Sequence, residues 1–147
     1  MPEINHQTYI KASIDKVYKT LSTAEGWNAW FTNQTSLHME QDGTGEIRLK
    51  WDGFGQEKLE LEDGGRILRA VRDESFVFQW SPGELVTTVE FKLEPYQKGT
   101  LIMLKEVGYS NSDKDIKACI NCAVGWGEAM TLLKIYLEEG IVYKEDL

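Results

Sequence analysis

Two cysteines are the first residues whose spacing could do chemistry. Cys119 and Cys122 form a C-x-x-C motif, which occurs in redox pairs and in zinc sites. A redox pair places its first thiol at a helix N-terminus, whereas these cysteines fall about two turns inside an expected helix. Zinc would need further ligands, and besides carboxylates the chain offers only His6 and His38. The sequence therefore favours a structural role for both thiols and indicates no metal or other cofactor.

Acid–base chemistry would have to use His38 or carboxylates. The chain contains no G-x-S-x-G motif, no H-E-x-x-H motif and no phosphate-binding glycine loop. His38 lies in the expected strand TSLHME, where a single histidine is more often structural than catalytic. No catalytic residue is thus indicated, and His38 is kept as a candidate ligand contact.

Aromatic residues are the more informative group, because a small-molecule site needs an apolar hollow with a few polar groups. A set of aromatic residues falls on the expected inward sides of the elements and could line such a hollow together with Met130: Trp27, Trp30, Trp51, Phe78, Trp80, Phe91 and Trp126. The alternative is that these side chains only fill the core, as most buried aromatic residues do. Both an open cavity and a filled core are compatible with the sequence.

A long helix over residues 112–140 must position Trp126 and Met130. Its apolar residues recur at steps of three and four, which predicts one buried stripe: Ile116, Cys119, Ile120, Ala123, Trp126, Met130, Leu133 and Leu137. Ser112 is expected as the N-cap, with Asp115 completing a capping box, and Gly140 as a left-handed C-cap.

Gly125 and Gly127 flank Trp126 inside this helix. Each glycine costs about 1 kcal/mol relative to alanine. That cost indicates either the close approach of another backbone or an emptied space beside the indole.

The preceding chain reads as strands with two short helices. A strand over residues 3–12 leads to a helix capped by Ser13, and Ser22 with Glu25 predicts a second capping box before AEGWNAWF. From Thr35 onward the period is two, with turns expected at 42–43, 52–55, 63–65, 82–83 and 95–99. The prediction is one α+β domain over residues 1–147, a curved antiparallel sheet of about six to seven strands wrapped around the C-terminal helix.

Glu106 ends the last expected strand, TLIMLKEVG. One face of this strand carries Thr100, Ile102, Leu104 and Glu106, and the other carries Leu101, Met103, Lys105 and Val107. If the first face packs on the helix, Glu106 points into the interior. If the strand turns its other face inward, or if its end lies at a wet rim, Glu106 is solvated.

Composition excludes several classes of protein. The net charge of −8 disfavours a nucleic-acid binder, which needs a basic surface. No stretch approaches the ~18 apolar residues of a membrane span, and the first residues lack the features of a secretory signal. We therefore expect no membrane insertion and a cytoplasmic location.

Several local motifs resemble the START-like (SRPBCC, birch-pollen-allergen-like) superfamily, and within it the group of activators of the heat-shock-chaperone ATPase (Aha-type). The similar stretches are residues 9–13 leading to Val17 and Leu21, Trp30-Phe31, FVFQW at 76–80, Gly99-Thr100, and Gly125-Trp126 followed by LKIYLEEG at 133–140. Asp73-Glu74 stands where that family often has proline.

The resemblance implies a helix-grip fold with a cavity between helix and sheet. It also implies members that bind lipids, sterols, polyketides or hormones, some of them cyclases or hydrolases. The expected partner is a small hydrophobic or amphipathic molecule that contacts the aromatic residues, Met130, His38 and Glu106. The alternative is a co-chaperone-like, stress-response domain that stimulates a chaperone ATPase, and cyclase or hydrolase activity is a third reading. Fold alone does not decide between them.

Overall fold

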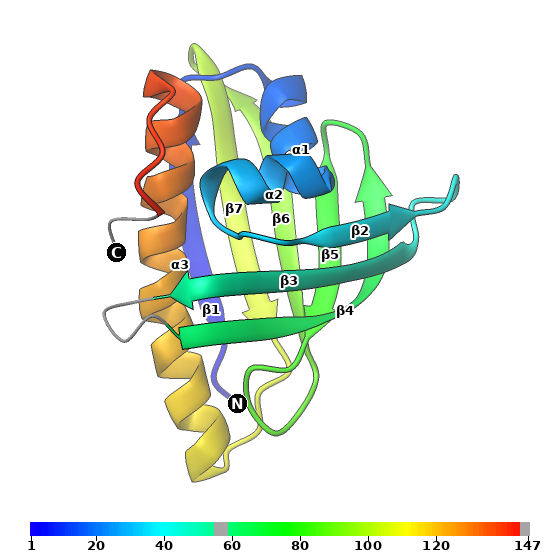
Figure 1. Ribbon diagram of the computed structural model, residues 1–147, viewed down its shortest axis with the longest axis vertical. Coiled ribbons are helices and arrows are strands. Elements are labelled where there is room, and N and C mark those ends of the chain that lie inside the picture. Colours follow the sequence, from blue (N-terminus) through cyan, green and yellow to red (C-terminus); the bar gives the residue numbers. More distant parts are fainter. Residues whose placement is uncertain (55–58, 145–147) are drawn as a thin grey trace.

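The computed structural model describes residues 1–54 and 59–144. Seven antiparallel strands form one sheet in the order β1-β7-β6-β5-β4-β3-β2 (Figure 1). The elements are β1 (Ile4–Ile10), α1 (Ile14–Ser22), α2 (Ala24–Trp30), β2 (Ser36–Met39), β3 (Gly45–Phe54), β4 (Leu59–Val71), β5 (Ser75–Trp80), β6 (Thr87–Tyr96), β7 (Gly99–Val107) and α3 (Asp113–Glu139). The predicted α+β helix-grip fold, with two short helices after the first strand, is confirmed.

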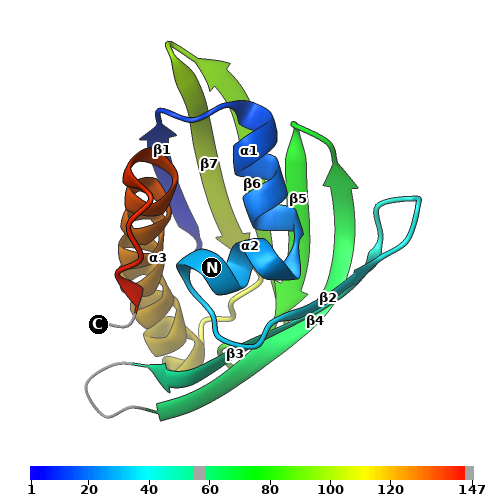
Figure 2. The ribbon, with the colours of Figure 1, turned by 45° about the horizontal axis from the view of Figure 1, so that its top comes forward.

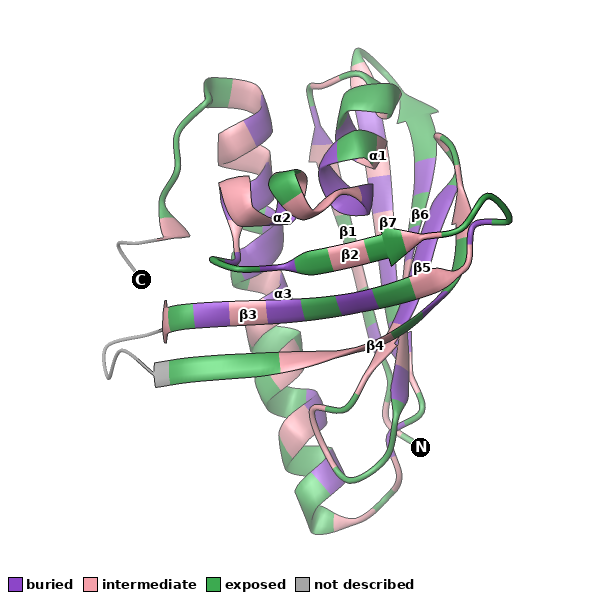
Figure 3. Cartoon of the chain, turned by 45° about the vertical axis from the view of Figure 1, so that its right-hand side comes forward, coloured by how far each residue is buried: buried purple, intermediate pink, exposed green. Residues whose placement is uncertain are grey.

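The sheet is strongly curved, and its concave side holds the core. In two views α1 and α2 cover this side and α3 runs lengthwise beside β1 (Figures 1 and 2), and Figure 1 shows β2–β4 crossing in front. Period-two alternation makes this possible, since each strand presents one apolar face inward. Figure 3 shows buried and exposed residues alternating along β3. One face of β6 and one face of β7, the face that carries Glu106, are buried: Thr87, Val89, Phe91, Leu93, Thr100, Ile102, Leu104 and Glu106.

β4 is one continuous strand through Asp63, Gly64 and Gly65, where the sequence predicted a turn. The two glycines serve close strand pairing instead. A Cβ atom at Gly64 would lie 2.1 Å from the Ile47 carbonyl oxygen, and one at Gly65 would lie 2.4 Å from that of Gln79. Backbone this close to both neighbouring strands requires glycine. β4 is therefore unbroken from Leu59 to Val71, and its first half, with Leu61 and Asp63, lies near α3.

Two further boundaries differ from the sequence prediction. Thr23, not Ser22, is the N-cap of α2, and its hydroxyl accepts from the Gly26 N–H at 3.0 Å. Ser22 is instead the last residue of α1. β3 runs on to Phe54 through the turn expected at 52–55, of which residue 55 lies outside the described part of the chain. Leu85 lies before β6 begins and is exposed.

The buried stripe of α3 is narrower at its N-terminal half than predicted. Cys119, Trp126, Met130, Leu133 and Leu137 are buried, but Ala123, Ile116 and Ile120 are exposed, the two isoleucines to 39% and 60%. Each isoleucine follows a buried residue by one position, so it lies about 100° around the helix from the buried side.

Asp115 occupies the buried position at the start of α3. Ser112 caps the helix as predicted, accepting from the Asp115 N–H at 3.1 Å. The Asp115 carboxylate does not reach back to Ser112, however. It accepts from the N–H groups of Glu84 at 2.6 Å and Ser110 at 2.7 Å, and so ties α3 to the loops after β5 and β7. Gly140 ends the helix with φ 69°, as predicted.

Within residues 1–54 and 59–144, none of the helices has the length and hydrophobicity that crossing a membrane requires.

The Asp115 contacts predict an acid-dependent loss of stability. Backbone hydrogen bonds from Ser110 and Glu84 hold the pKa of Asp115 below its usual value. The stability from such a carboxylate is complete above the unfolded-state pKa of about 3.9 and is lost as pH falls toward the lower folded-state pKa. Asp115→Asn should therefore unfold more easily than the wild type at pH 6, and the difference should shrink by pH 3. Urea unfolding at both pH values measures it. Asp113→Asn, in the same turn but exposed, is the control, and a difference independent of pH would contradict the assignment.

Candidate functional site

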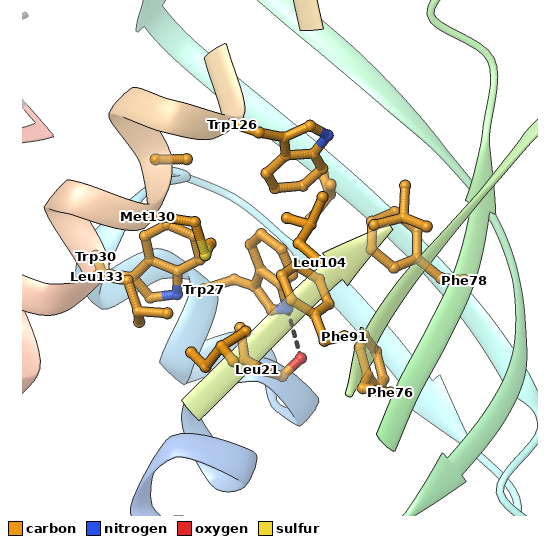
Figure 4. Close-up of a cluster of buried hydrophobic side chains, with 14 of the residues drawn as sticks. Leu21, Trp27, Trp30, Phe76, Phe78, Phe91, Leu104, Trp126, Met130 and Leu133 are labelled. Atoms are coloured by element: carbon orange, nitrogen blue, oxygen red, sulfur yellow. Dashed lines mark hydrogen bonds between the residues drawn. The ribbon is translucent and has the colours of Figure 1, made fainter. Parts of the chain in front are cut away.

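An aromatic cluster fills the space between α2, α3 and the sheet (Figure 4). Trp27 stands at its centre, with ring centroids 5.1 Å from Trp30, 6.1 Å from Phe78 and 6.2 Å from Phe91. The Trp27 indole N–H donates to the Leu21 carbonyl at 2.8 Å, which satisfies its polar atom inside the core. These close ring contacts show that the side chains around Trp27 pack against one another.

A pocket of about 450 Å³ lies beside this cluster, between α3 and the ends of β3, β4 and β5. Its size is within the range of small-molecule sites. Most of its wall is apolar, with a few polar groups among the lining residues: Phe31, Trp51, Leu61, Glu62, Asp63, Trp80, Ser81, Pro82, Asn121, Cys122, Gly125 and Trp126. The sequence left open whether the aromatic interior is a cavity or a core, and the fold contains both, side by side.

Glu106 fixes two walls of this pocket from behind. It is fully buried. Its Oε2 atom accepts from the Trp80 indole N–H at 2.7 Å, the Thr87 hydroxyl at 2.7 Å and the Tyr109 hydroxyl at 2.9 Å. Its Oε1 atom accepts from the Trp126 indole N–H at 2.9 Å. Of the two orientations that the sequence left open for Glu106, the structure shows the inward one and excludes a solvated carboxylate.

The two indole rings held by Glu106 lie next to each other. Their centroids are 5.4 Å apart, and both rings line the pocket. Because the carboxylate takes up both indole N–H groups, these rings have only apolar faces left for a ligand. The polar contacts for a ligand must therefore come from the other lining residues.

Cys122 adds a neutral thiol to the pocket wall. Burial raises the pKa of Cys122 to about 11; a hydrogen bond with Tyr109 acts against this rise, and the charge of Glu106 adds to it. Burial also raises the pKa of the Tyr109 phenol well above its usual value, as do its contacts with Cys122 and Glu106. Both groups stay protonated at neutral pH. Cys119 and Cys122 are free thiols.

The structure brings three of the proposed ligand contacts together at the pocket: Trp51, Trp80 and Trp126. Five others lie in the packed cluster: Trp27, Trp30, Phe78, Phe91 and Met130. Glu106 lies behind the wall, and His38 is exposed on β2, where its ring lies 2.9 Å from Glu40. Ligand binding by any of these residues stays a prediction.

Sequence reasoning missed much of the pocket wall. Asp63 escaped notice because it was placed in the turn expected at 63–65, and neither Leu61 nor Phe31 was among the proposed ligand contacts. Cys122 carried a usable signal, since it precedes Trp126 by four residues and so shares its side of α3.

The two glycines of α3 have different surroundings. A Cβ atom would meet nothing within 4 Å at either Gly125 or Gly127, so emptied space rather than backbone contact explains both. Only Gly125 lines the pocket.

Among the residues that the structure describes, no group of three or more His, Cys, Asp or Glu side chains is arranged to hold a metal ion.

A family model described as Activator of Hsp90 ATPase homolog 1-like protein matches residues 11–138. A search of curated proteins gave no match. The solution structure of the Aha1 dimer from Colwellia psychrerythraea is 24% identical, with a TM-score of 0.75 over 95% of this chain and 98% of that one.

Two further solved structures are similar. CalU16 from Micromonospora echinospora is 20% identical, with a TM-score of 0.69 over 94% of this chain and 77% of that one. The di-domain ARO/CYC StfQ from the steffimycin biosynthetic pathway is 10% identical, with a TM-score of 0.70 over 95% of this chain and 52% of that one. Likeness at these identities shows the fold alone.

The Glu106 network generates a stability prediction. Glu106→Gln places an amide NH₂ where one acceptor oxygen was, which leaves at least one buried donor without a partner. We expect the free energy of unfolding to fall by about 2–3 kcal/mol, as for the loss of hydrogen bonds to a charged group. Urea unfolding measures this change. The control is Glu94→Gln at an exposed position of β6, and a Glu106→Gln protein as stable as that control would contradict the role of the network.

Proposed function

The chain belongs to the Activator of Hsp90 ATPase homolog 1-like protein family of the START-like (SRPBCC) superfamily, and from this premise we propose that it binds a small hydrophobic or amphipathic ligand. The ligand occupies the pocket between α3 and the ends of β3–β5. No bond-making chemistry is assigned to the pocket.

One observation carries this proposal: an apolar pocket of about 450 Å³ whose aromatic walls are fixed in place. Trp80 and Trp126 are held by hydrogen bonds to Glu106, so they need not reorganise to receive a ligand. Walls that are ordered before binding reduce the entropic cost of association. Asn121 and Ser81, which also line the pocket, offer polar contacts to an amphipathic ligand.

A second candidate function is stimulation of a heat-shock-chaperone ATPase. The description of the family names Hsp90 ATPase activation, and a structural neighbour is named Aha1. We rank this role below ligand binding, because the pocket gives ligand binding a defined place on this chain.

Filling the pocket should abolish binding. N-phenyl-1-naphthylamine, a neutral probe that fluoresces in apolar surroundings, should bind the wild type, and Gly125→Leu should weaken its binding by about tenfold or more, since the leucine occupies the space. The measurement is a fluorescence titration.

The matched control is Gly127→Leu. It adds the same side chain to the same helix, also into open space, but Gly127 does not line the pocket. Both changes replace a helical glycine and gain similar helix propensity, so neither should unfold the protein. Equal binding by the two variants would place the ligand elsewhere. A protein that binds no probe but accelerates ATP hydrolysis by an Hsp90-type chaperone would favour the second role.

A further inference from the structure

The charged residues that line the pocket all carry negative charge. Two of its lining residues, Glu62 and Asp63, are acidic, and none of the described lining residues is lysine, arginine or histidine. A pocket made only for a neutral apolar ligand has no need of a carboxylate beside its aromatic walls, since a partly buried charge is costly. The position of each carboxylate therefore matters.

Asp63 is the carboxylate that faces the interior. In the β3–β4 register it is paired with Leu49, which is fully buried, and directly paired residues on antiparallel strands share a face. Glu62 is paired with Lys50, and its carboxylate binds the Arg48 guanidinium at 3.1 Å on the opposite, outer face. Only the charge of Asp63 is thus directed to the pocket.

The carboxylate of Asp63 is hydrogen-bonded but has no cationic partner among the described ion pairs. Its Oδ1 atom accepts from the backbone N–H groups of Gly64 at 2.7 Å and Ser81 at 3.0 Å. These bonds hold the group in position and leave its negative charge without a counter-ion. Asp63 is also the smallest contribution to the raised pKa of Cys122 in the pocket wall, after burial, the charge of Glu106 and that of Cys119.

Glu106 adds to the same field from behind the wall. Its carboxylate accepts the indole N–H groups of Trp80 and Trp126, and hydrogen bonds of this kind polarise the donor. Electron density then shifts into the two indole rings, whose residues line the pocket. The faces of tryptophan rings attract cations, and a nearby carboxylate strengthens the attraction.

We propose, building on the ligand-binding function above, that the pocket selects organic cations: an ammonium or similar charged group on a flat apolar body. The apolar body lies against the aromatic walls, and the cationic group lies beside Asp63.

Three probes of nearly equal shape test this selectivity: phenyltrimethylammonium, the neutral tert-butylbenzene and the anionic benzenesulfonate. Each is titrated into the ¹⁵N-labelled full chain, and the NMR shifts of the Trp80 and Trp126 indole N–H signals report its binding. The cation should bind at least about fivefold more tightly than the neutral probe, as expected for a cation over aromatic faces, and the anion should bind most weakly.

Asp63→Asn removes the charge and keeps an acceptor oxygen for the Ser81 and Gly64 N–H groups. It should weaken binding of the cation by about threefold or more and leave the neutral probe within about twofold. Glu94→Gln, which removes the same charge from an exposed site outside the pocket, should change the binding of neither the cation nor the neutral probe.

The two proposals fail differently. If the neutral probe binds as tightly as the cation in the wild type, cation selectivity is wrong and ligand binding stands. If Glu94→Gln lowers the preference for the cation over the neutral probe as much as Asp63→Asn does, the overall net charge of the protein produces that preference. The inference about the pocket is then wrong as well. If none of the three probes shifts the indole signals, the ligand-binding function itself is contradicted.

Discussion

The hydrogen bonds to Glu106 join separate parts of the fold at one buried carboxylate. β7 supplies the acceptor, and the donors come from the end of β5 (Trp80), the start of β6 (Thr87), the loop after β7 (Tyr109) and the middle of α3 (Trp126). An unsatisfied buried carboxylate would cost several kcal/mol. The packing of α3 on the sheet is therefore tied to polar geometry as well as to apolar contact.

This constraint also determines what the pocket can recognise. Both indole rings turn their N–H edges toward Glu106, and both residues line the pocket. A ligand there meets rigid aromatic faces, a neutral thiol at Cys122 and one inward carboxylate at Asp63. Such a wall suits recognition by shape and charge.

The pocket and the packed core are parts of one aromatic network. The ring centroid of Trp126 lies 5.7 Å from that of Phe91 in the core and 5.4 Å from that of Trp80 at the pocket. Trp30 stacks on Phe31, and the ring centroid of Phe31 lies 5.2 Å from that of Trp51, which also lines the pocket. The core stabilises the pocket walls without occupying the pocket.

Local patterns in the sequence determined most of the fold. The period of two assigned the inward faces of β3 and β6 and the two faces of β7, and the period of 3.6 assigned α3 and the burial of Trp126, because these depend on neighbours along the chain. The packing of the sheet then decided which face of β7, the one with Glu106, points inward. Only the tertiary structure decided that Asp63-Gly64-Gly65 continues β4, since the close approach of the β3 and β5 backbones is invisible in sequence. Long-range packing likewise placed Trp27 in the core and Trp51 at the pocket, two tryptophans that the sequence alone could not tell apart.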